Sequence, residues 1–171
     1  MILRLSQKLN TKLKVGTLSS MPLDENPFAD WSANLFVAAR TQYILVTNTK
    51  SLYSVVIYGK GITDDCSFIQ RVLSNLNEFL ADDGQQFVYQ KFIAPASGSV
   101  RFAKALDRSV TGSMNDMLFH AKACLILDEL SPYDVGFKLN EIPFKSLKYA
   151  KPKEAFKSMH VTRPAQEEEE V

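Results

Sequence analysis

The segment from Asp107 to Asp116 (DRSVTGSMND) holds the residue types of this chain that are best suited to chemistry. It places small hydroxyl residues and a glycine at the expected junction of a strand and a helix. The first amide groups of a helix lack intrahelical partners and lie at the positive end of the helix dipole, so they attract anions. A glycine lets a ligand approach the backbone, and an arginine contacts phosphate or carboxylate through two N–H groups. The pattern predicts an anion-binding site made by Arg108, Ser109, Gly112, Ser113 and Asn115.

An ordinary capped helix is the competing interpretation of this segment. Ser113 followed by Asp116 resembles a capping box, and Arg108 would then be a solvated charge. The two interpretations also assign different roles to two polar residues that come earlier in the chain. Under the binding hypothesis, Asn34 or Arg40 converges with Arg108 on one cleft. Under the alternative, Arg40 belongs to a turn and Asn34 faces solvent.

Established catalytic and metal-binding patterns match the chain poorly. His120 and His160 are the two histidines, and they do not form a two-histidine metal motif. The glycine-rich nucleotide patterns GxGxxG and GxxxxGK[ST] do not occur. We therefore expect no metal and no cofactor, and we favour a non-enzymatic interaction or regulatory protein. The alternative is an enzyme acting on a phosphate-containing or nucleic-acid substrate, with Arg108 and Arg40 stabilising negative charge.

Composition limits the remaining classes of partner. A net charge of +1 argues against a strong overall attraction to nucleic acid or membrane. Basic residues are nevertheless concentrated in two stretches, so a weak nucleic-acid interaction through Lys8, Lys12, Lys14 and residues 145–157 is a third hypothesis. No apolar run approaches the roughly 20 residues of a membrane helix, and the first residues do not resemble a secretion signal. The sequence predicts a cytoplasmic protein without membrane contact and with an unknown partner.

Residues 31–58 carry the strongest β pattern of the chain. Residues 31–38, 42–48 and 52–58 are apolar runs rich in aromatic and β-branched residues, joined by connectors of about three residues. Such short connectors predict an antiparallel three-stranded meander. Residues 1–5 are expected to form a further strand, followed by a short helix that Ser6 caps.

Helical periodicity is clearest after Asp64, where apolar residues recur to about Asp82 with the spacing of a helix that packs on a sheet. Residues 86–93 and 99–106 are expected to form a second hairpin. A helix should then begin near residues 109–113 and end near Asp128, followed by short helices after Ser131 and over residues 152–159. The two cysteines, Cys66 and Cys124, fall in helical patterns and are expected to be free buried thiols.

The expected order of elements is β-α-βββ-α-ββ-α-α-α. It predicts an α+β fold with a mainly antiparallel sheet of about five to six strands and helices mainly on one face. The length of 171 residues suits one domain, which we assign to residues 1–159. Residues 160–171 contain four consecutive glutamates and are predicted to be a disordered acidic tail.

Several motifs together resemble a family of uncharacterised bacterial proteins that is catalogued as a domain of unknown function. The motifs are WSANLF at 31–36, RTQY at 40–43, TN at 47–48, SLYS at 51–54 and RSVTGSMND at 108–116. A similar pattern occurs in plasmid-encoded open reading frames of unknown function. The resemblance spans most of residues 1–159, and Thr111 stands where relatives have leucine. It implies no catalytic residue, but it suggests that residues 108–115 matter as a site.

Overall fold

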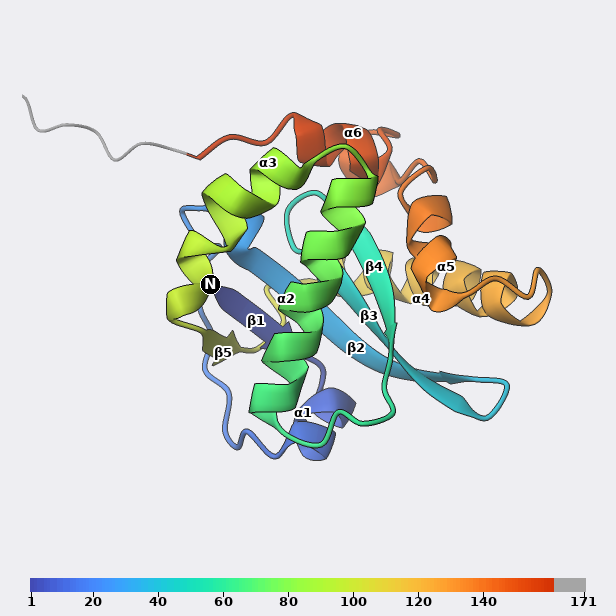
Figure 1. Ribbon diagram of the computed structural model, residues 1–171, viewed down its shortest axis with the longest axis horizontal. Helices are drawn as coiled ribbons and strands as arrows, with labels where there is room; N and C mark the ends of the chain where they lie inside the picture. Colours follow the sequence, from blue (N-terminus) through green and yellow to red (C-terminus); the bar gives the residue numbers. More distant parts are fainter. Residues whose placement is uncertain (162–171) are drawn as a thin grey trace, which may run out of the picture.

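The computed structural model describes residues 1–161 as a five-stranded sheet with helices on both faces (Figure 1). The strands lie side by side in the order β4-β3-β2-β1-β5. They are β1 (Ile2–Leu5), β2 (Asp30–Ala38), β3 (Thr41–Asn48), β4 (Ser54–Tyr58) and β5 (Arg101–Ala103). The helices are α1 (Gln7–Leu13), α2 (Asp65–Asp82), α3 (Gln86–Val88), α4 (Arg108–Ile126), α5 (Pro132–Leu139) and α6 (Pro152–Lys157). Residues 162–171, most of the expected tail, lie outside the described residues.

The sheet is mixed, although the predicted α+β class is confirmed. The meander of β2, β3 and β4 is antiparallel, as its short connectors predicted. The first strand, β1, instead pairs in parallel with β2 on one side and with β5 on the other. Half of the strand pairings are therefore parallel. The expectation of a mainly antiparallel sheet was wrong for the pairings of β1 with β2 and β5.

Helices cover both faces of the sheet, which corrects the expectation that they lie mainly on one. In Figure 1, α2 crosses in front of the sheet and α4 lies behind it. On the α2 side, Phe68, Val72 and Leu76 are fully buried in a core that also takes residues of α1. On the α4 side, Met114 and Met117 are buried in a second core. Each strand of the meander places alternate residues in the two cores, which is why its runs are almost continuously apolar.

The expected second hairpin was wrong. Residues 86–93 form α3 and the π-helical segment Tyr89–Ile93, and a 3₁₀ turn at Pro95–Gly98 follows. A short apolar run fits a strand or one helical face about equally well, and here Ile93 is fully buried while Phe87 is 62% exposed. Of the expected strand 99–106, Arg101–Ala103 alone forms a strand, and it pairs with β1.

Most of the expected helix starts are confirmed, and the side chains that cap them are present. Ser6 accepts the Leu9 amide at the start of α1, and Asp64 accepts the Ser67 amide at the start of α2. Ser131 likewise accepts the Asp134 amide at the start of α5. Cys66 and Cys124 are free thiols as expected, but neither is buried, because Cys66 lies exposed in the first turn of α2 and Cys124 is half-buried.

A buried ion pair joins β1 to the start of β2. Arg4 and Asp30 are 1% and 0% exposed, and two hydrogen bonds of 2.8 Å join them. The remaining Arg4 donors bind the backbone carbonyls of Met21, Pro22 and Lys104. The guanidinium thus holds the loop before β2 and the chain after β5 against β1.

Side-chain or backbone contacts also occupy both edges of the sheet. At the β4 edge, Asn140 accepts the Ser54 amide at 2.7 Å and donates to the Ser54 carbonyl at 3.0 Å, as a neighbouring strand would. At the β5 edge, the Lys104 amide donates to the Ser19 carbonyl at 3.0 Å, and Ser19 bridges to Ala103. The backbone around these positions is therefore hydrogen-bonded on its outer side.

Candidate functional site

The first turn of α4 is arranged differently from the expectation. The helix begins at Arg108, and the cap is Asp107, whose Oδ1 accepts the Val110 amide at 2.9 Å. The amides of Gly112, Ser113 and Met114 consequently lie in the second turn, where the helix directs them to preceding carbonyls. They are not the free donors that the predicted anion site required. The capping box predicted for Ser113 and Asp116 is also absent, because both residues lie inside the helix.

A small hollow lined by hydroxyl groups nevertheless lies beside this helix start. Its volume is about 80 Å³, and we call it the hydroxyl pocket; its lining residues are Thr49, Lys50, Leu52, Ser109, Val110, Ser113, Ser146 and Leu147. Ser113 and Ser146 share a hydrogen bond of 2.8 Å across it. Only one of the two hydroxyls donates its proton in that bond. The O–H group of the other hydroxyl is therefore free to donate to a ligand. Thr49 does not contribute, because its hydroxyl donates to Asp30 at 2.7 Å.

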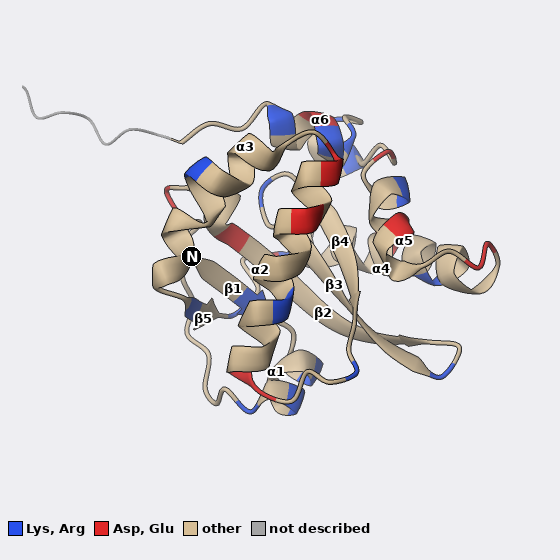
Figure 2. Ribbon diagram, viewed as in Figure 1, with Lys and Arg blue, Asp and Glu red and all other residues tan. Residues whose placement is uncertain are grey.

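The one charged residue that lines the hydroxyl pocket is a lysine. Lys50 lines it, and it contains no carboxylate among its lining residues. Arg108, Lys145 and Lys148 each adjoin a lining residue in the sequence and are exposed. Further lysines follow on α6 and in the loop before it (Figure 2), where Lys151 pairs with Glu141 and Lys153 pairs with Asp83. Two predicted residues, Ser109 and Ser113, therefore line a hollow whose single charged lining residue is a lysine, and an anion could occupy it.

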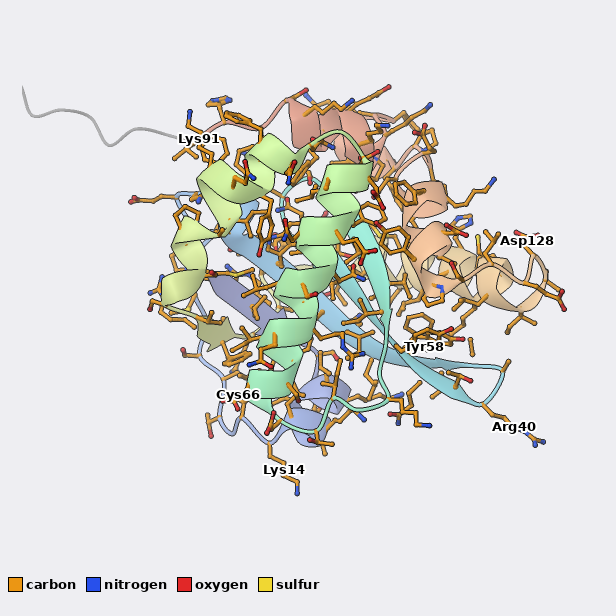
Figure 3. The ribbon with its side chains drawn as sticks, in the orientation of Figure 1. Lys14, Arg40, Tyr58, Cys66, Lys91 and Asp128 are labelled. Carbon is orange, nitrogen blue, oxygen red and sulfur yellow. The ribbon has the colours of Figure 1, made fainter. Side chains whose placement is uncertain are left out.

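The other predicted residues do not converge on this hollow. Gly112 and Asn115 are exposed on α4 and line no hollow described here. Arg40 is exposed in the turn between β2 and β3 with a φ of 65°, and its side chain extends away from the molecule in Figure 3. Asn34 is half-buried and lines a different hollow, together with Val110 and Thr111. Neither of these two hollows therefore joins Arg108, Asn34 and Arg40.

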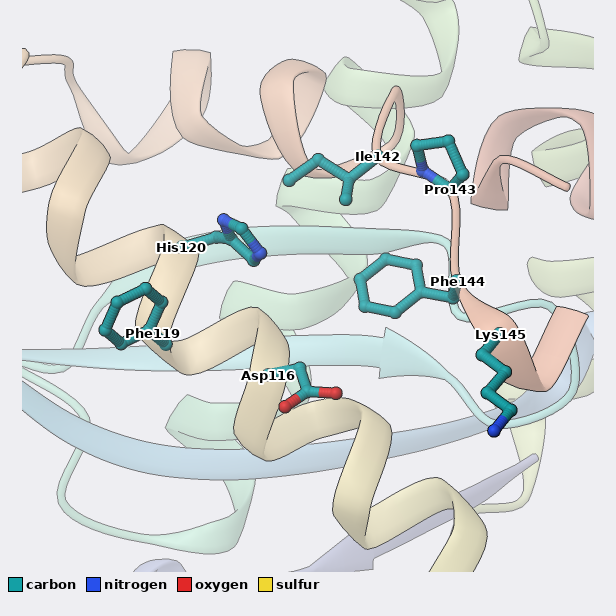
Figure 4. A pocket seen from close by; sticks show the side chains of 7 residues that line it. All are labelled: Asp116, Phe119, His120, Ile142, Pro143, Phe144 and Lys145. Carbon is teal, nitrogen blue, oxygen red and sulfur yellow. The ribbon is translucent and has the colours of Figure 1, made fainter. Parts of the chain in front are cut away.

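A third hollow, of about 210 Å³, lies between α4 and the loop that follows α5 (Figure 4). Phe119 and His120 come from α4, and Ile142 and Phe144 come from the loop. Phe119 is 74% exposed. Further along α4, Ile126 is 48% exposed, and Leu127, just beyond the helix, is 78% exposed. The outer half of α4 thus presents large apolar side chains to solvent.

The two basic stretches considered for nucleic-acid binding do not share a face. The first lies on α1 and the second runs to α6, and these helices occupy opposite ends of the molecule in Figure 1. Lys12 is also engaged, because its Nζ donates to the Gln42 side chain at 2.9 Å. Within residues 1–161, no helix is both long enough and apolar enough to cross a membrane. No group of three His, Cys, Asp or Glu side chains in that range could hold a metal ion.

Comparison with known proteins identifies the family. The model of a domain of unknown function, DUF6933, matches residues 2–155. The chain belongs to this family. The DUF6933 match runs from β1 into α6, so it includes every strand and both hollows beside the start of α4. No curated protein and no solved structure matches the chain.

Sequence reasoning missed the partners that complete the hydroxyl pocket. Lys50 lies in the connector between β3 and β4, and Ser146 lies in a 3₁₀ turn far along the chain. Ser146 falls within the basic stretch 145–157, which was the only signal that could have drawn attention to it. Neither residue is near Ser109 in sequence, so their meeting depends on the way α4 packs behind the sheet.

Proposed function

We propose that this chain is a non-enzymatic binding protein that recognises a phosphate-type anion in the hydroxyl pocket. The observation that carries the proposal is that Ser109, Ser113, Ser146 and Lys50 line one hollow, in which the Ser113 and Ser146 hydroxyls meet. Hydroxyl groups donate hydrogen bonds to phosphate oxygens, and a lysine supplies charge. The start of α4 adds a favourable dipole on the same side.

The size of the hydroxyl pocket sets the kind of ligand. A volume of about 80 Å³ accommodates one tetrahedral anion or a few water molecules, since one water takes about 30 Å³. A phosphoryl group attached to a larger molecule could enter it while the rest of that molecule stays outside. We expect Arg108, Lys145 and Lys148, which are exposed and adjoin lining residues in the sequence, to contact the outer part.

The test is a thermal-shift titration with inorganic phosphate, at ionic strength held constant with sodium chloride. Phosphate should raise the melting temperature of the wild-type chain, because a ligand that binds only the folded state stabilises it. Lys50→Met and Ser146→Ala should remove most of that rise, and Arg108→Ala should reduce it. Lys60→Met is the matched control, because Lys60 is an exposed lysine that lines no hollow described here. An equal rise in Lys50→Met and Lys60→Met would contradict the proposal.

An enzyme acting on a phosphate-containing substrate remains the alternative, and the same pocket would be its site. It predicts release of phosphate from a phosphorylated compound by the purified chain, with loss of the activity in Ser109→Ala or Ser113→Ala. The binding proposal predicts stabilisation without turnover. A malachite-green assay for released phosphate distinguishes the two.

A protein partner is the second candidate function, and the exposed Phe119, Ile126 and Leu127 favour it. Apolar side chains grouped on one element are typical of surfaces that contact other proteins. A photoreactive phenylalanine analogue placed at position 119 should form one defined adduct in cells. Placed at Phe87, which is 62% exposed elsewhere on the molecule, the same analogue should not form that adduct. Identical adducts from both positions would show non-specific contact.

A further inference from the structure

Two adjoining hollows meet at the end of β1, on the other side of the start of α4 from the hydroxyl pocket. The first, of about 230 Å³, lies between β1, Asn34 of β2 and the first turns of α4. The second, of about 450 Å³, lies between the start of α1, residues 16–18 and residues 104–105. Both are lined by Leu5, Ser6, Gln7 and Ala105, so they form one groove, which we call the β1–β5 crevice.

The topology of the sheet explains why a crevice forms at this place. The strands β1 and β5 are parallel neighbours, and the crevice lies beyond their carboxyl ends. The chain leaves β1 into α1, whose Leu9 and Leu13 pack in the core on the α2 side. It leaves β5 toward α4, whose Met114 packs on the opposite face. Where the connections from adjacent parallel strands diverge to opposite faces, they leave an opening, and ligands of open α/β sheets bind in such openings.

The walls of the β1–β5 crevice are mainly apolar. Leu5, Leu18, Val110 and Met114 supply this surface, drawn from four different segments of the chain. Together the two hollows fall within the range of about 300–1,000 Å³ that is usual for small-molecule sites. The anchoring of the loop before β2 and the chain after β5 by Arg4 makes the crevice a preformed feature of the fold.

A few polar groups in the crevice are available to a ligand. The Asn34 side chain makes no hydrogen bond within residues 1–161, and it can both donate and accept. Arg4 also lines the crevice, but all five of its N–H donors are already used by the contacts with Asp30 and three backbone carbonyls. Lys104 is the remaining charged lining residue, and it is exposed at the rim. The lining of both hollows contains no carboxylate.

We propose that the β1–β5 crevice binds a small organic acid with a mainly apolar body. The body lies along Leu18, Val110 and Met114, and its acidic group pairs with Lys104 at the rim. Asn34 hydrogen-bonds a polar group deeper in the crevice. This site is separate from the hydroxyl pocket, because Val110 is the only residue that lines both.

Isothermal titration calorimetry with decanoate tests the proposal, and decanol serves as its uncharged analogue. Decanoate should bind wild-type protein with a negative heat-capacity change, which marks burial of apolar surface. Ala105→Trp should fill the boundary of the two hollows and weaken binding by at least tenfold, or about 1.4 kcal/mol. Gln7→Trp should fill the same boundary from an exposed position on α1 and weaken binding to a similar extent. With two such variants, the test stands even if one of them fails to fold.

The charge is tested by Lys104→Met, with Lys60→Met as the matched control. Lys104→Met should weaken decanoate by about two- to fivefold, as expected of an exposed ion pair, and should leave decanol unchanged. Loss of affinity for both compounds alike, or for neither, would contradict the role of Lys104. Absence of decanoate binding to the wild-type chain, or full binding in both tryptophan variants, would overturn the site itself. Phosphate stabilisation through Lys50 should persist in all of these variants, so the two proposals fail separately.

Discussion

Arg4 and Asp30 lie on the same face of neighbouring parallel strands, and the guanidinium of Arg4 binds both carboxylate oxygens of Asp30 at 2.8 Å. Both side chains are excluded from solvent. Asp30 also accepts the Thr49 hydroxyl and the Asp24 amide, so this carboxylate joins β1, the connector after β3 and the loop before β2. A single buried pair therefore connects the segments that shape the β1–β5 crevice.

Arg4→Met should destabilise the fold by about 3–5 kcal/mol, because it leaves the Asp30 carboxylate buried without its countercharge. Urea unfolding followed by circular dichroism measures the change. Arg101→Met is the matched control, since Arg101 is an exposed arginine on the adjacent β5. A loss in Arg4→Met no larger than that in the control would show that water compensates the missing guanidinium.

Gly136 and Gly112 provide a contrasting pair of substitutions to alanine within helices. A Cβ at Gly136 would lie 2.8 Å from the Phe79 ring and 3.2 Å from the Ser54 carbonyl, so Gly136→Ala should destabilise by about 1–3 kcal/mol. A Cβ at Gly112 would meet nothing within 4 Å, so Gly112→Ala should stabilise by about 0.5–1 kcal/mol. Opposite shifts in melting temperature are expected, and a shift of the same sign in both would refute the packing of α5 on β4.

Leu76→Ala should cost about 2–5 kcal/mol, because Leu76 is fully buried between α2 and the sheet and its truncation leaves a cavity. Asn77→Ala, at the neighbouring exposed position of the same helix, controls for helix propensity. The comparison is made by chemical denaturation. Equal effects at the two positions would mean that α2 does not pack as described.

Stability should fall at alkaline pH through Tyr53. Burial and the 2.6 Å hydrogen bond to Asp83 raise the pKa of Tyr53 well above its usual value. The unfolded chain loses this proton near pH 10 while the folded chain keeps it, so stability is complete below about pH 10 and then declines by about 1.4 kcal/mol per pH unit. Urea unfolding between pH 8 and 11 should show a shallower decline in Tyr53→Phe. Tyr149→Phe, at a site that is 69% exposed, should keep the wild-type slope.

The sequence predicted the parts of the fold that depend on local chemistry. The meander followed from short connectors between apolar runs, and α2 followed from the helical periodicity after Asp64. The parallel pairing of β1 with β5 could not be predicted in this way, because it joins residues about a hundred positions apart and no local pattern records strand order. The assignment of residues 86–93 as a strand was wrong because eight mainly apolar residues suit either secondary structure.

The candidate site was likewise predicted only in its local features. The residue types of 108–116 marked this segment as a candidate site. The helix start was misplaced, however, because Asp107 acts as the cap in preference to Ser113. Ser109 and Ser113 line a hollow, whereas Lys50 and Ser146 reach it from distant segments. Arg4 could not be distinguished from a surface charge, because only the folded chain surrounds it with acceptors.

The contacts of Asn140 with Ser54 and of Ser19 with the chain beside β5 also bear on how copies of this protein behave at high concentration. An outer strand with free amides and carbonyls is a template on which a second molecule can extend the sheet. Here an incoming strand would first have to displace a hydrogen-bonded asparagine at one edge or a backbone bridge at the other. Asn140→Ala should therefore do more than loosen α5, because it exposes the Ser54 backbone and opens a route to intermolecular sheet growth and aggregation.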